Sequence, residues 1–177
     1  LRQISENASE AAVLRRAREE ISAANSLDNA LANAEQALRQ LTPDTAYALY
    51  LYDGSSDSIR CETAAADGNF IKGLIIPLGE RVSGWCAATR RTSMNSDAAL
   101  DLGTIAKQSS PDLRSTLATP ILHGDMLIGV LTAYAPRAEA FNEAHRYCVE
   151  DIALAFAALL ARTNGSHNVI SFRKSHY

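Results

Sequence analysis

The amino-acid sequence predicts an α+β domain with a mainly antiparallel sheet. Three observations support this fold class. Apolar residues recur at three- and four-residue steps over the first forty residues, which is typical of amphipathic helices. After Pro43 the pattern changes to short β-rich segments separated by turn residues. A second helical pattern returns over Phe141–Ala161, so the strands lie between leading helices and one closing helix.

The first predicted helix runs over Ser5–Ala24, where alanines and leucines follow the helical period. Leu14, Ile21 and Asp28 lie seven residues apart, so this part of the chain could carry a short heptad seam for a second copy. A second amphipathic run covers Leu27–Leu41. Ser26 supplies a helix start for it, and Pro43 ends it because proline cannot continue a helix.

Six strands are predicted between these helices and the closing one. The first is apolar on both faces, as a central strand should be, and the second alternates in polarity after a turn cluster. The last two form the clearest hairpin, with a turn at His123-Gly124-Asp125. In chain order the predicted strands are Thr45–Tyr52, Ile59–Thr63, Leu74–Leu78, Thr92–Met94, Arg114–Leu122 and Met126–Ala135.

The segments between the strands predict less regular structure. Asp67-Gly68-Asn69 is expected to be a loop. The second half of Gly79–Arg90 predicts a short helix that is capped near Ser83. Residues 95–112 are polar and loop-like, with a single helical turn at Ala98–Leu102.

Composition and charge exclude several function classes. The chain has 177 residues, 47% of them apolar, and a net charge of −3, without basic clusters beyond pairs. Nucleic acid and anionic membrane surfaces are therefore poor candidate partners. No secretory signal or membrane-spanning run is apparent, and the three cysteines are sparse, so a cytoplasmic location is expected. No His/Cys group has zinc spacing.

Two stretches carry a family resemblance. The stretch GERVSGWCAATRRTSMNSD, residues 79–97, and the stretch LRSTLATPILHGDMLIGVLTAYAP, residues 113–136, resemble the middle signature and the closing hairpin of the GAF family. The phenylalanine and helix that follow, AFNEAHRYCVEDIALAFAALLA, also fit that family. The resemblance covers roughly Ser26–Ala161, most of the chain.

The resemblance implies a six-stranded antiparallel sheet, with N- and C-terminal helices on one face and a ligand pocket on the other. We therefore expect an N-terminal signalling or dimerisation helix at 1–25, a GAF domain at 26–162 and a flexible tail at 163–177. The resemblance also implies a homodimer formed through the terminal helices. Because the chain begins at Leu1 rather than methionine, we expect a covalently linked effector domain in a longer signalling protein.

Six residues are the candidates for lining the ligand pocket that the resemblance implies: Trp85, Asn95, Asp97, Arg114, Ser115 and Tyr134. Each of three has a structural alternative. Asp97 could cap the turn at Ala98–Leu102. Arg114, a potential anion ligand, could instead pair with Asp112 or Asp97. Trp85 could simply pack against the sheet, as large aromatic residues usually do.

Three known activities of the family match this sequence less well. A methionine-sulfoxide reductase branch carries a cysteine in the Gly-x-Cys position of Cys86, but its chemistry needs a second cysteine before the closing hairpin, and Ala98–Ser115 has none. The Asn-Lys pair of cyclic-nucleotide-binding members is absent. Cys148 and His145 resemble a tetrapyrrole attachment pair, but Cys148 belongs to the apolar stripe of the closing helix.

The sequence therefore predicts a non-catalytic sensory or regulatory domain that binds a small molecule, mediates homodimerisation, or both. The identity of the ligand, or of any cofactor, is not predicted. Two alternatives remain open. One is a purely structural dimerisation module whose pocket is filled by Tyr47, Tyr50 and Tyr52, and the other is the reductase.

Overall fold

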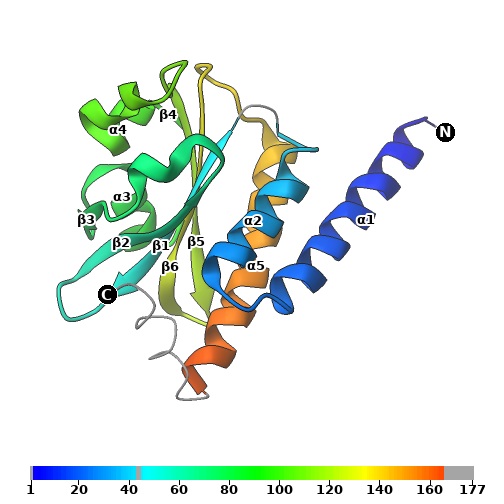
Figure 1. Ribbon diagram of the computed structural model, residues 1–177, viewed down its shortest axis with the longest axis horizontal. Coiled ribbons are helices and arrows are strands. Elements are labelled where there is room, and N and C mark those ends of the chain that lie inside the picture. Colours follow the sequence, from blue (N-terminus) through cyan, green and yellow to red (C-terminus); the bar gives the residue numbers. More distant parts are fainter. Residues whose placement is uncertain (1, 43–44, 166–177) are drawn as a thin grey trace.

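The computed structural model describes residues 2–42 and 45–165. The chain folds into three layers, with one sheet between two groups of helices (Figure 1). The predicted α+β class and the six-stranded antiparallel sheet are confirmed. The strands are β1 (Ala46–Asp53), β2 (Ser58–Ala65), β3 (Ile75–Pro77), β4 (Ser93–Ser96), β5 (Ser115–His123) and β6 (Met126–Ala135).

Strand β1 lies in the middle of the sheet. The strand order is β3-β2-β1-β6-β5-β4, and every neighbouring pair is antiparallel. The first five residues of β1 are all buried, which matches a strand covered on both faces. Alternate residues divide between the two sides of the sheet: Tyr47 and Leu49 face one core, and Ala48 and Tyr50 face the other.

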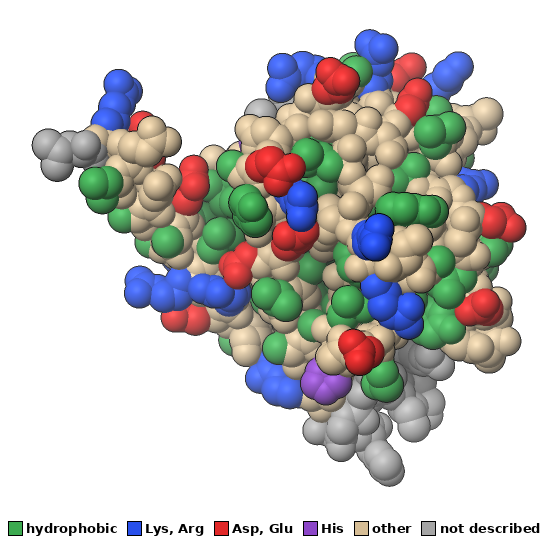
Figure 2. Space-filling view, turned by 180° about the vertical axis from the view of Figure 1, so that it is seen from behind, with side chains coloured by type: hydrophobic (Ala, Val, Ile, Leu, Met, Phe, Trp, Pro, Cys, Tyr) green, Lys and Arg blue, Asp and Glu red, His purple; other side chains and the backbone are tan. Residues whose placement is uncertain are grey.

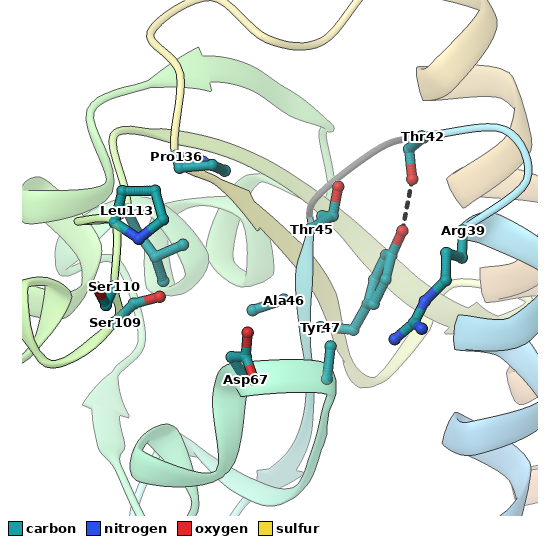
Figure 3. Close-up of a pocket in the computed structure, with 12 residues that line it drawn as sticks. Arg39, Thr42, Thr45, Ala46, Tyr47, Asp67, Ser109, Ser110, Leu113 and Pro136 are labelled. Atoms are coloured by element: carbon teal, nitrogen blue, oxygen red, sulfur yellow. Dashed lines mark hydrogen bonds between the residues drawn. The ribbon is translucent and has the colours of Figure 1, made fainter.

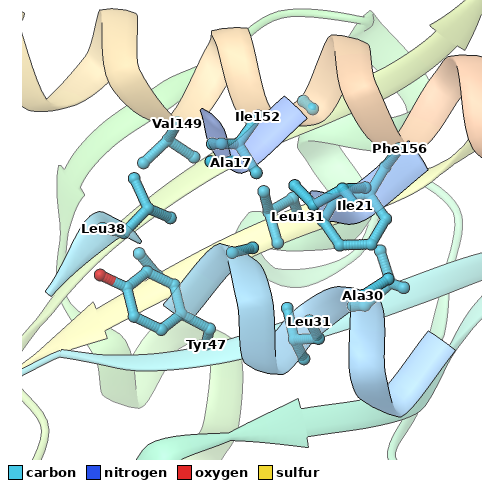
Figure 4. Close-up of a cluster of buried hydrophobic side chains, with 14 of the residues drawn as sticks. Ala17, Ile21, Ala30, Leu31, Leu38, Tyr47, Leu131, Val149, Ile152 and Phe156 are labelled. Atoms are coloured by element: carbon cyan, nitrogen blue, oxygen red, sulfur yellow. The ribbon is translucent and has the colours of Figure 1, made fainter. Parts of the chain in front are cut away.

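Helices α1 (Arg2–Ser22), α2 (Leu27–Leu38) and α5 (Glu143–Gly165) cover one face of the sheet. Helices α2 and α5 pack on the strands, and α1 packs on α2 and α5. The core between these helices and the sheet is apolar, and its side chains come from α1, α2, α5 and the strands (Figure 4). It includes Ile21, Leu31, Leu131, Ile152 and Phe156.

The helix boundaries differ from prediction in ways that the local contacts explain. Ser26 caps α2 as expected, because its Oγ accepts a hydrogen bond from the Asn29 N–H at 3.1 Å. Helix α2 ends at Leu38, three residues earlier than predicted. The seam of Leu14, Ile21 and Asp28 is interrupted, because α1 ends at Ser22 and Asp28 belongs to α2. Ile21 is fully buried within its own chain, so it is not available to a second copy.

The other face of the sheet, which we call the front face, is covered by short helices. These are α3 (Arg81–Thr89), α4 (Ala98–Leu102) and the 3₁₀ segments η1 (Ala66–Ile71) and η2 (Gly103–Gln108). The predicted helical turn at Ala98–Leu102 is confirmed, and Asp97 caps it by accepting from the Ala99 N–H at 2.9 Å. The loop expected at Asp67-Gly68-Asn69 is instead part of η1.

Helix α3 begins two residues before the predicted cap. Glu80 is its N-cap residue. Ser83 lies inside the helix, where its fully buried side chain does not cap the helix but bonds to another element. Most of the tail expected at 163–177 lies outside the described residues. Within the part of the chain that the structure describes, no helix combines the length and the apolar character needed to cross a bilayer.

Gly129 on β6 provides a test of the sheet register. It lies opposite Leu51 on β1, and a Cβ at this position would lie 2.0 Å from the Tyr50 carbonyl oxygen. Gly129→Ala should therefore lower the free energy of unfolding by about 3 kcal/mol, because the backbone of a central strand must shift. Urea denaturation followed by circular dichroism measures this change. Gly54→Ala is the control, because its nearest contact would be an ordinary 3.7 Å to the Tyr52 side chain; equal stability of the two variants would contradict the register.

Candidate functional site

A buried carboxylate lies at the centre of the front face. Asp101 on α4 has no exposed surface, although it carries an ionisable group. Its Oδ1 accepts a hydrogen bond from the Ser83 N–H at 2.7 Å. Its Oδ2 accepts from the Ser83 hydroxyl and from the Tyr134 hydroxyl, both at 2.6 Å. One side chain of α4 is therefore tied to α3 and to strand β6 at the same time.

Two further hydroxyl groups extend this arrangement. Tyr50 OH lies 2.6 Å from Tyr134 OH, and Thr132 Oγ1 lies 2.9 Å from Ser83 Oγ. Because Tyr134 and Ser83 use their hydrogens on the carboxylate, they accept hydrogen bonds from Tyr50 and Thr132. All donation therefore runs toward Asp101, which suits an ionised carboxylate. We call Asp101, Ser83, Tyr134, Tyr50 and Thr132 the front-face network.

Burial and the Asp101 charge have the largest effects on the pKa values of the two tyrosines in the front-face network. Burial raises the pKa of Tyr50 and of Tyr134 well above the usual value, and the negative charge of Asp101 adds to the effect. Among the described residues no basic side chain forms an ion pair with Asp101, and Arg81 donates to its main-chain oxygen at 2.8 Å. A buried carboxylate without a cation is retained only when hydrogen bonds satisfy it.

Thr116 adds a polar group that is not satisfied. It pairs with Tyr134 across β5 and β6, so the two side chains lie next to each other on the front face. Its side chain is fully buried, and its Oγ1 has no hydrogen-bond partner among the described residues. Such a group favours a polar ligand atom or an ordered water beside it.

A cavity of about 450 Å³ opens at the start of β1, next to the front-face network (Figure 3). Its wall combines the end of α2, the start of η1 and the segment before β5. The lining residues include Arg39, Thr42, Tyr47, Asp67, Ser109 and Leu113. Ala46 also lines it and is the direct partner of Tyr134 in the sheet, so the cavity adjoins the tyrosine that holds Asp101.

The side chains of the predicted lining residues do not converge on one site, although Asp97, Arg114 and Tyr134 lie on adjacent segments. Tyr134 belongs to the front-face network. Trp85, on α3, keeps 43% of its surface exposed, so it is not a core aromatic residue. Asn95 lies at the bulge in β4 and binds the main chain of Phe141: its Nδ2 donates to the carbonyl at 2.8 Å, and its Oδ1 accepts from the N–H at 3.0 Å.

The other three predicted residues have structural contacts. Asp97 is the cap of α4 described above. Arg114 is exposed, and the alternative ion pair with Asp112 or Asp97 is not present in the structure. Ser115 shares a side of β5 with Leu117, which faces the helices, and its hydroxyl donates to the Arg137 carbonyl at 2.7 Å. Ser115 therefore faces away from the front face.

Sequence reasoning did not find Asp101, Ser83 or Thr132. The alternation of polar residues at Thr132 and Tyr134 in an otherwise apolar hairpin was an available signal for the front face. Ser83 and Asp101 lie on two different short helices, eighteen positions apart in the chain, and no local pattern encodes their contact.

The cysteine thiols and the potential metal ligands were the remaining candidates for chemistry at the site. Cys86 on α3 is fully buried, and burial, followed by the charge of Asp101, raises the pKa of its thiol. All three cysteines are free and buried. In residues 2–42 and 45–165 no group of three or more His, Cys, Asp or Glu side chains could hold a metal ion. Burial raises the pKa of all three thiols.

Tyr134→Phe tests the importance of the front-face network. The change removes the donor to Asp101 and the acceptor for Tyr50, which leaves a buried carboxylate partly unsatisfied. The free energy of unfolding should fall by about 1–3 kcal/mol in thermal or urea denaturation. Tyr147→Phe, at a position 64% exposed, should change it by no more than about 0.5 kcal/mol. A Tyr134→Phe variant as stable as this control would show that the hydrogen bonds contribute little.

Known proteins place this fold in a family. A family model for the GAF domain matches residues 24–161. The GAF domain of a phosphoenolpyruvate-protein phosphotransferase from Coxiella burnetii superposes with a TM-score of 0.74 at 21% identity, covering 89% of this chain and 96% of that one. The corresponding Acinetobacter domain gives 0.72 at 16% identity, covering 89% and 95%.

A third similar structure is an enzyme. Free methionine-R-sulfoxide reductase from Neisseria meningitidis, in complex with its substrate, has a TM-score of 0.69 at 20% identity, covering 91% of this chain and 93% of that one. No curated protein sequence matches the chain significantly. At these identities the similar structures establish the fold alone, whereas the family model covers most of the sequence. The chain belongs to the GAF domain family.

Proposed function

We propose that the chain is a sensory or regulatory domain of a cytoplasmic signalling protein, and that it binds a polar small molecule on the front face. One observation carries this proposal: a buried carboxylate, which forms no ion pair with a described basic side chain, joins two short helices to the sheet next to an open cavity. A purely structural core would not need a polar network here, because apolar side chains of similar volume would be at least as stable.

The ligand would act by changing how α3 and α4 sit on the sheet. Ser83 and Tyr134 both bind Asp101, so a ligand that competes for any of these groups loosens α4 from β6. A ligand shifts the equilibrium only by its difference in affinity between the two positions of these helices. An attached effector domain would respond to that shift through the helices on the other face.

The alternative of a filled, purely structural module has partial support. Tyr50 occupies the front face, whereas Tyr47 points to the helices and is bonded to Thr42 at 2.5 Å. The adjoining cavity of about 450 Å³ leaves room that Tyr50 does not fill. This volume favours the ligand-binding proposal.

Catalysis is not part of the proposal. The similar structure from Neisseria meningitidis is a reductase with bound substrate, so a small molecule can occupy this fold. Sulfoxide reduction by thiols needs an accessible thiolate. The Cys86 thiol is buried beside the Asp101 charge, and both effects keep it protonated.

The test of ligand binding uses Trp85 as its reporter, because it is the only tryptophan and lies on α3. Native mass spectrometry of the purified chain should show a co-purified small molecule. If it shows none, adding the low-molecular-weight fraction of a cell extract should change Trp85 fluorescence. Ser83→Ala should strengthen the response about tenfold, because it removes a hydrogen bond to a charged group with which the ligand competes. Ser55→Ala, in the β1–β2 turn, is the control. An extract that leaves both mass and fluorescence unchanged would contradict the proposal.

We also propose that two copies associate through α1 and α5. Seen from behind, α1 projects from the body of the molecule with hydrophobic and charged side chains interspersed (Figure 2). Ile4 on α1 is 71% exposed, and Tyr147 and Leu154 on α5 are 64% and 66% exposed. Tyr147 and Leu154 are seven residues apart, so they lie on one side of α5. Such a surface would be covered by the same surface of a second copy.

Tyr147→Glu combined with Leu154→Glu should therefore weaken self-association at least about tenfold in sedimentation equilibrium, because two charges would enter an apolar contact. Leu100→Glu is the matched control, since Leu100 is 65% exposed on α4, on the front face. Association that is unchanged by the double variant, or absent in the original chain, would contradict this dimer.

A further inference from the structure

Asn142 and His145 close the first turn of α5 by binding each other twice. The Asn142 Oδ1 accepts a hydrogen bond from the His145 N–H at 3.0 Å, and the His145 Nδ1 accepts one from the Asn142 N–H at 3.2 Å. This is the reciprocal arrangement of a capping box, which satisfies main-chain donors that the start of a helix leaves free. Glutamate or glutamine usually supplies the second acceptor, whereas here it is a titratable imidazole.

The hydrogen bond from Asn142 determines the protonation state of His145. Nδ1 can accept a hydrogen bond only while it carries no proton, so the closed cap requires a neutral ring with its hydrogen on Nε2. A proton on Nδ1 would place two N–H groups opposite each other and break this bond. Protonation of His145 therefore opens one half of the capping box, while the other half can remain.

The surroundings of His145 favour the neutral ring. Partial burial lowers the pKa of His145 from its ordinary value of 6.5. A positive charge is also unfavourable at this end of α5, because the free N–H groups of a helix start carry partial positive charge. Glu10 on α1 acts in the opposite direction and raises the pKa. A protonated ring would therefore be attracted to α1.

The other ionisable side chains near His145 come from α5 itself and from the connection between β6 and α5. They are Arg137, Glu143 and Arg146. Glu143 and Arg146 form an ion pair at 3.3 Å, and Arg137 is exposed. The connection between α2 and β1 contributes two uncharged residues, Thr42 and Thr45, to the small cavity beside the imidazole. The charge that a protonated ring would meet on another helix is therefore that of Glu10.

Hydrogen bonds lead from this cap toward the front face. The Phe141 ring meets the His145 ring edge to face, with the ring centroids 6.2 Å apart. The Asn95 side chain binds both the N–H and the carbonyl of Phe141, which directly precedes Asn142. Asn95 in turn lies two residues before Asp97, the cap of α4. The start of α5 is thus connected through β4 to the start of α4.

We propose that His145 is a pH-sensitive cap of α5, which closes the helix start when it is neutral and loosens the connection between Phe141 and β4 when it is protonated. On protonation the ring leaves the Asn142 N–H and turns toward Glu10. Phe141 then loses its ring contact with His145, and the segment that Asn95 binds becomes freer to move. This switch needs no ligand, so it is independent of the proposed ligand binding.

The stability of the chain should depend on pH with a definite sign. Because folding lowers the pKa of His145, the stability that the neutral ring contributes is complete above pH 6.5 and is lost as the pH falls through the folded value. Between about pH 7.5 and about pH 5.5 the unfolding equilibrium constant should therefore rise at least about twofold more in the original chain than in His145→Gln.

Glutamine is the informative replacement for His145, because it keeps an acceptor at this position of a capping box and does not titrate. The matched control is His123→Gln, in the exposed turn between β5 and β6, which should behave as the original chain does. Urea denaturation at several pH values measures all three proteins.

NMR titration of the ¹⁵N-labelled original chain separates a switch from a cap with a structural role alone. The His145 ring signals should show the Nε2–H tautomer at neutral pH and a midpoint below 6.5. The main-chain amide signal of Asn142 and the side-chain amide signals of Asn95 should move with the same midpoint, because both groups are connected to the ring through hydrogen bonds.

Glu10→Gln should lower the midpoint of His145 further, because it removes the charge that favours the protonated ring. Glu6→Gln, one turn earlier on α1, is the matched control and should leave the midpoint unchanged. A midpoint at or above 6.5, an Nδ1–H tautomer, Asn95 signals that do not follow His145, a Glu10→Gln midpoint that does not fall, or a His145→Gln variant with the pH dependence of the original chain would overturn the inference.

Discussion

Hydrogen bonding to the buried Asp101 carboxylate is the constraint on which the front face depends. A carboxyl group with no exposed surface must be satisfied by hydrogen bonds, and three donors from α3 and β6 do so at 2.6–2.7 Å. Any movement of α4 must break these bonds together. The short helix is therefore either docked with its charge satisfied or displaced far enough for water or a ligand to replace the donors.

The two faces of the sheet have different roles for the same reason. The helix-facing core is built from apolar side chains of α1, α2, α5 and the strands, and its stability comes from non-directional burial. The front face mixes apolar side chains with directed hydrogen bonds, which are either made or lost. The two faces of the sheet are therefore stabilised in different ways.

Sequence reasoning recovered the six strands, the order of helices and strands along the chain, and the helix-facing core, because these follow from periodicity and turn residues. It also identified helix capping by Asp97 as the alternative to ligand binding, and Asp97 does cap α4. It misplaced Ser115, since one residue of register decides which face a strand residue occupies. It missed Asp101 and Ser83, because a contact between two short helices depends on tertiary packing and leaves no local pattern.

Asn95 and Arg114 show a further limit of the resemblance. Both belong to the segments that the resemblance assigns to the pocket. The Asn95 side chain instead forms hydrogen bonds with the main chain of Phe141, and Arg114 is exposed to solvent. The cavity lies instead at the start of β1, where residues from α2, η1 and the segment before β5 meet. Such a meeting point is determined by strand order, and only the folded chain reveals it.

The most direct measurement of the central claim is amide hydrogen exchange of the Asp101→Asn variant, compared with the original chain. The account predicts faster exchange, by about tenfold or more, in α3 and α4, with unchanged protection in α1, α2 and α5. Unchanged protection of α3 and α4, or an equal loss of protection over all helices, would contradict the claim that Asp101 holds these two helices on the sheet.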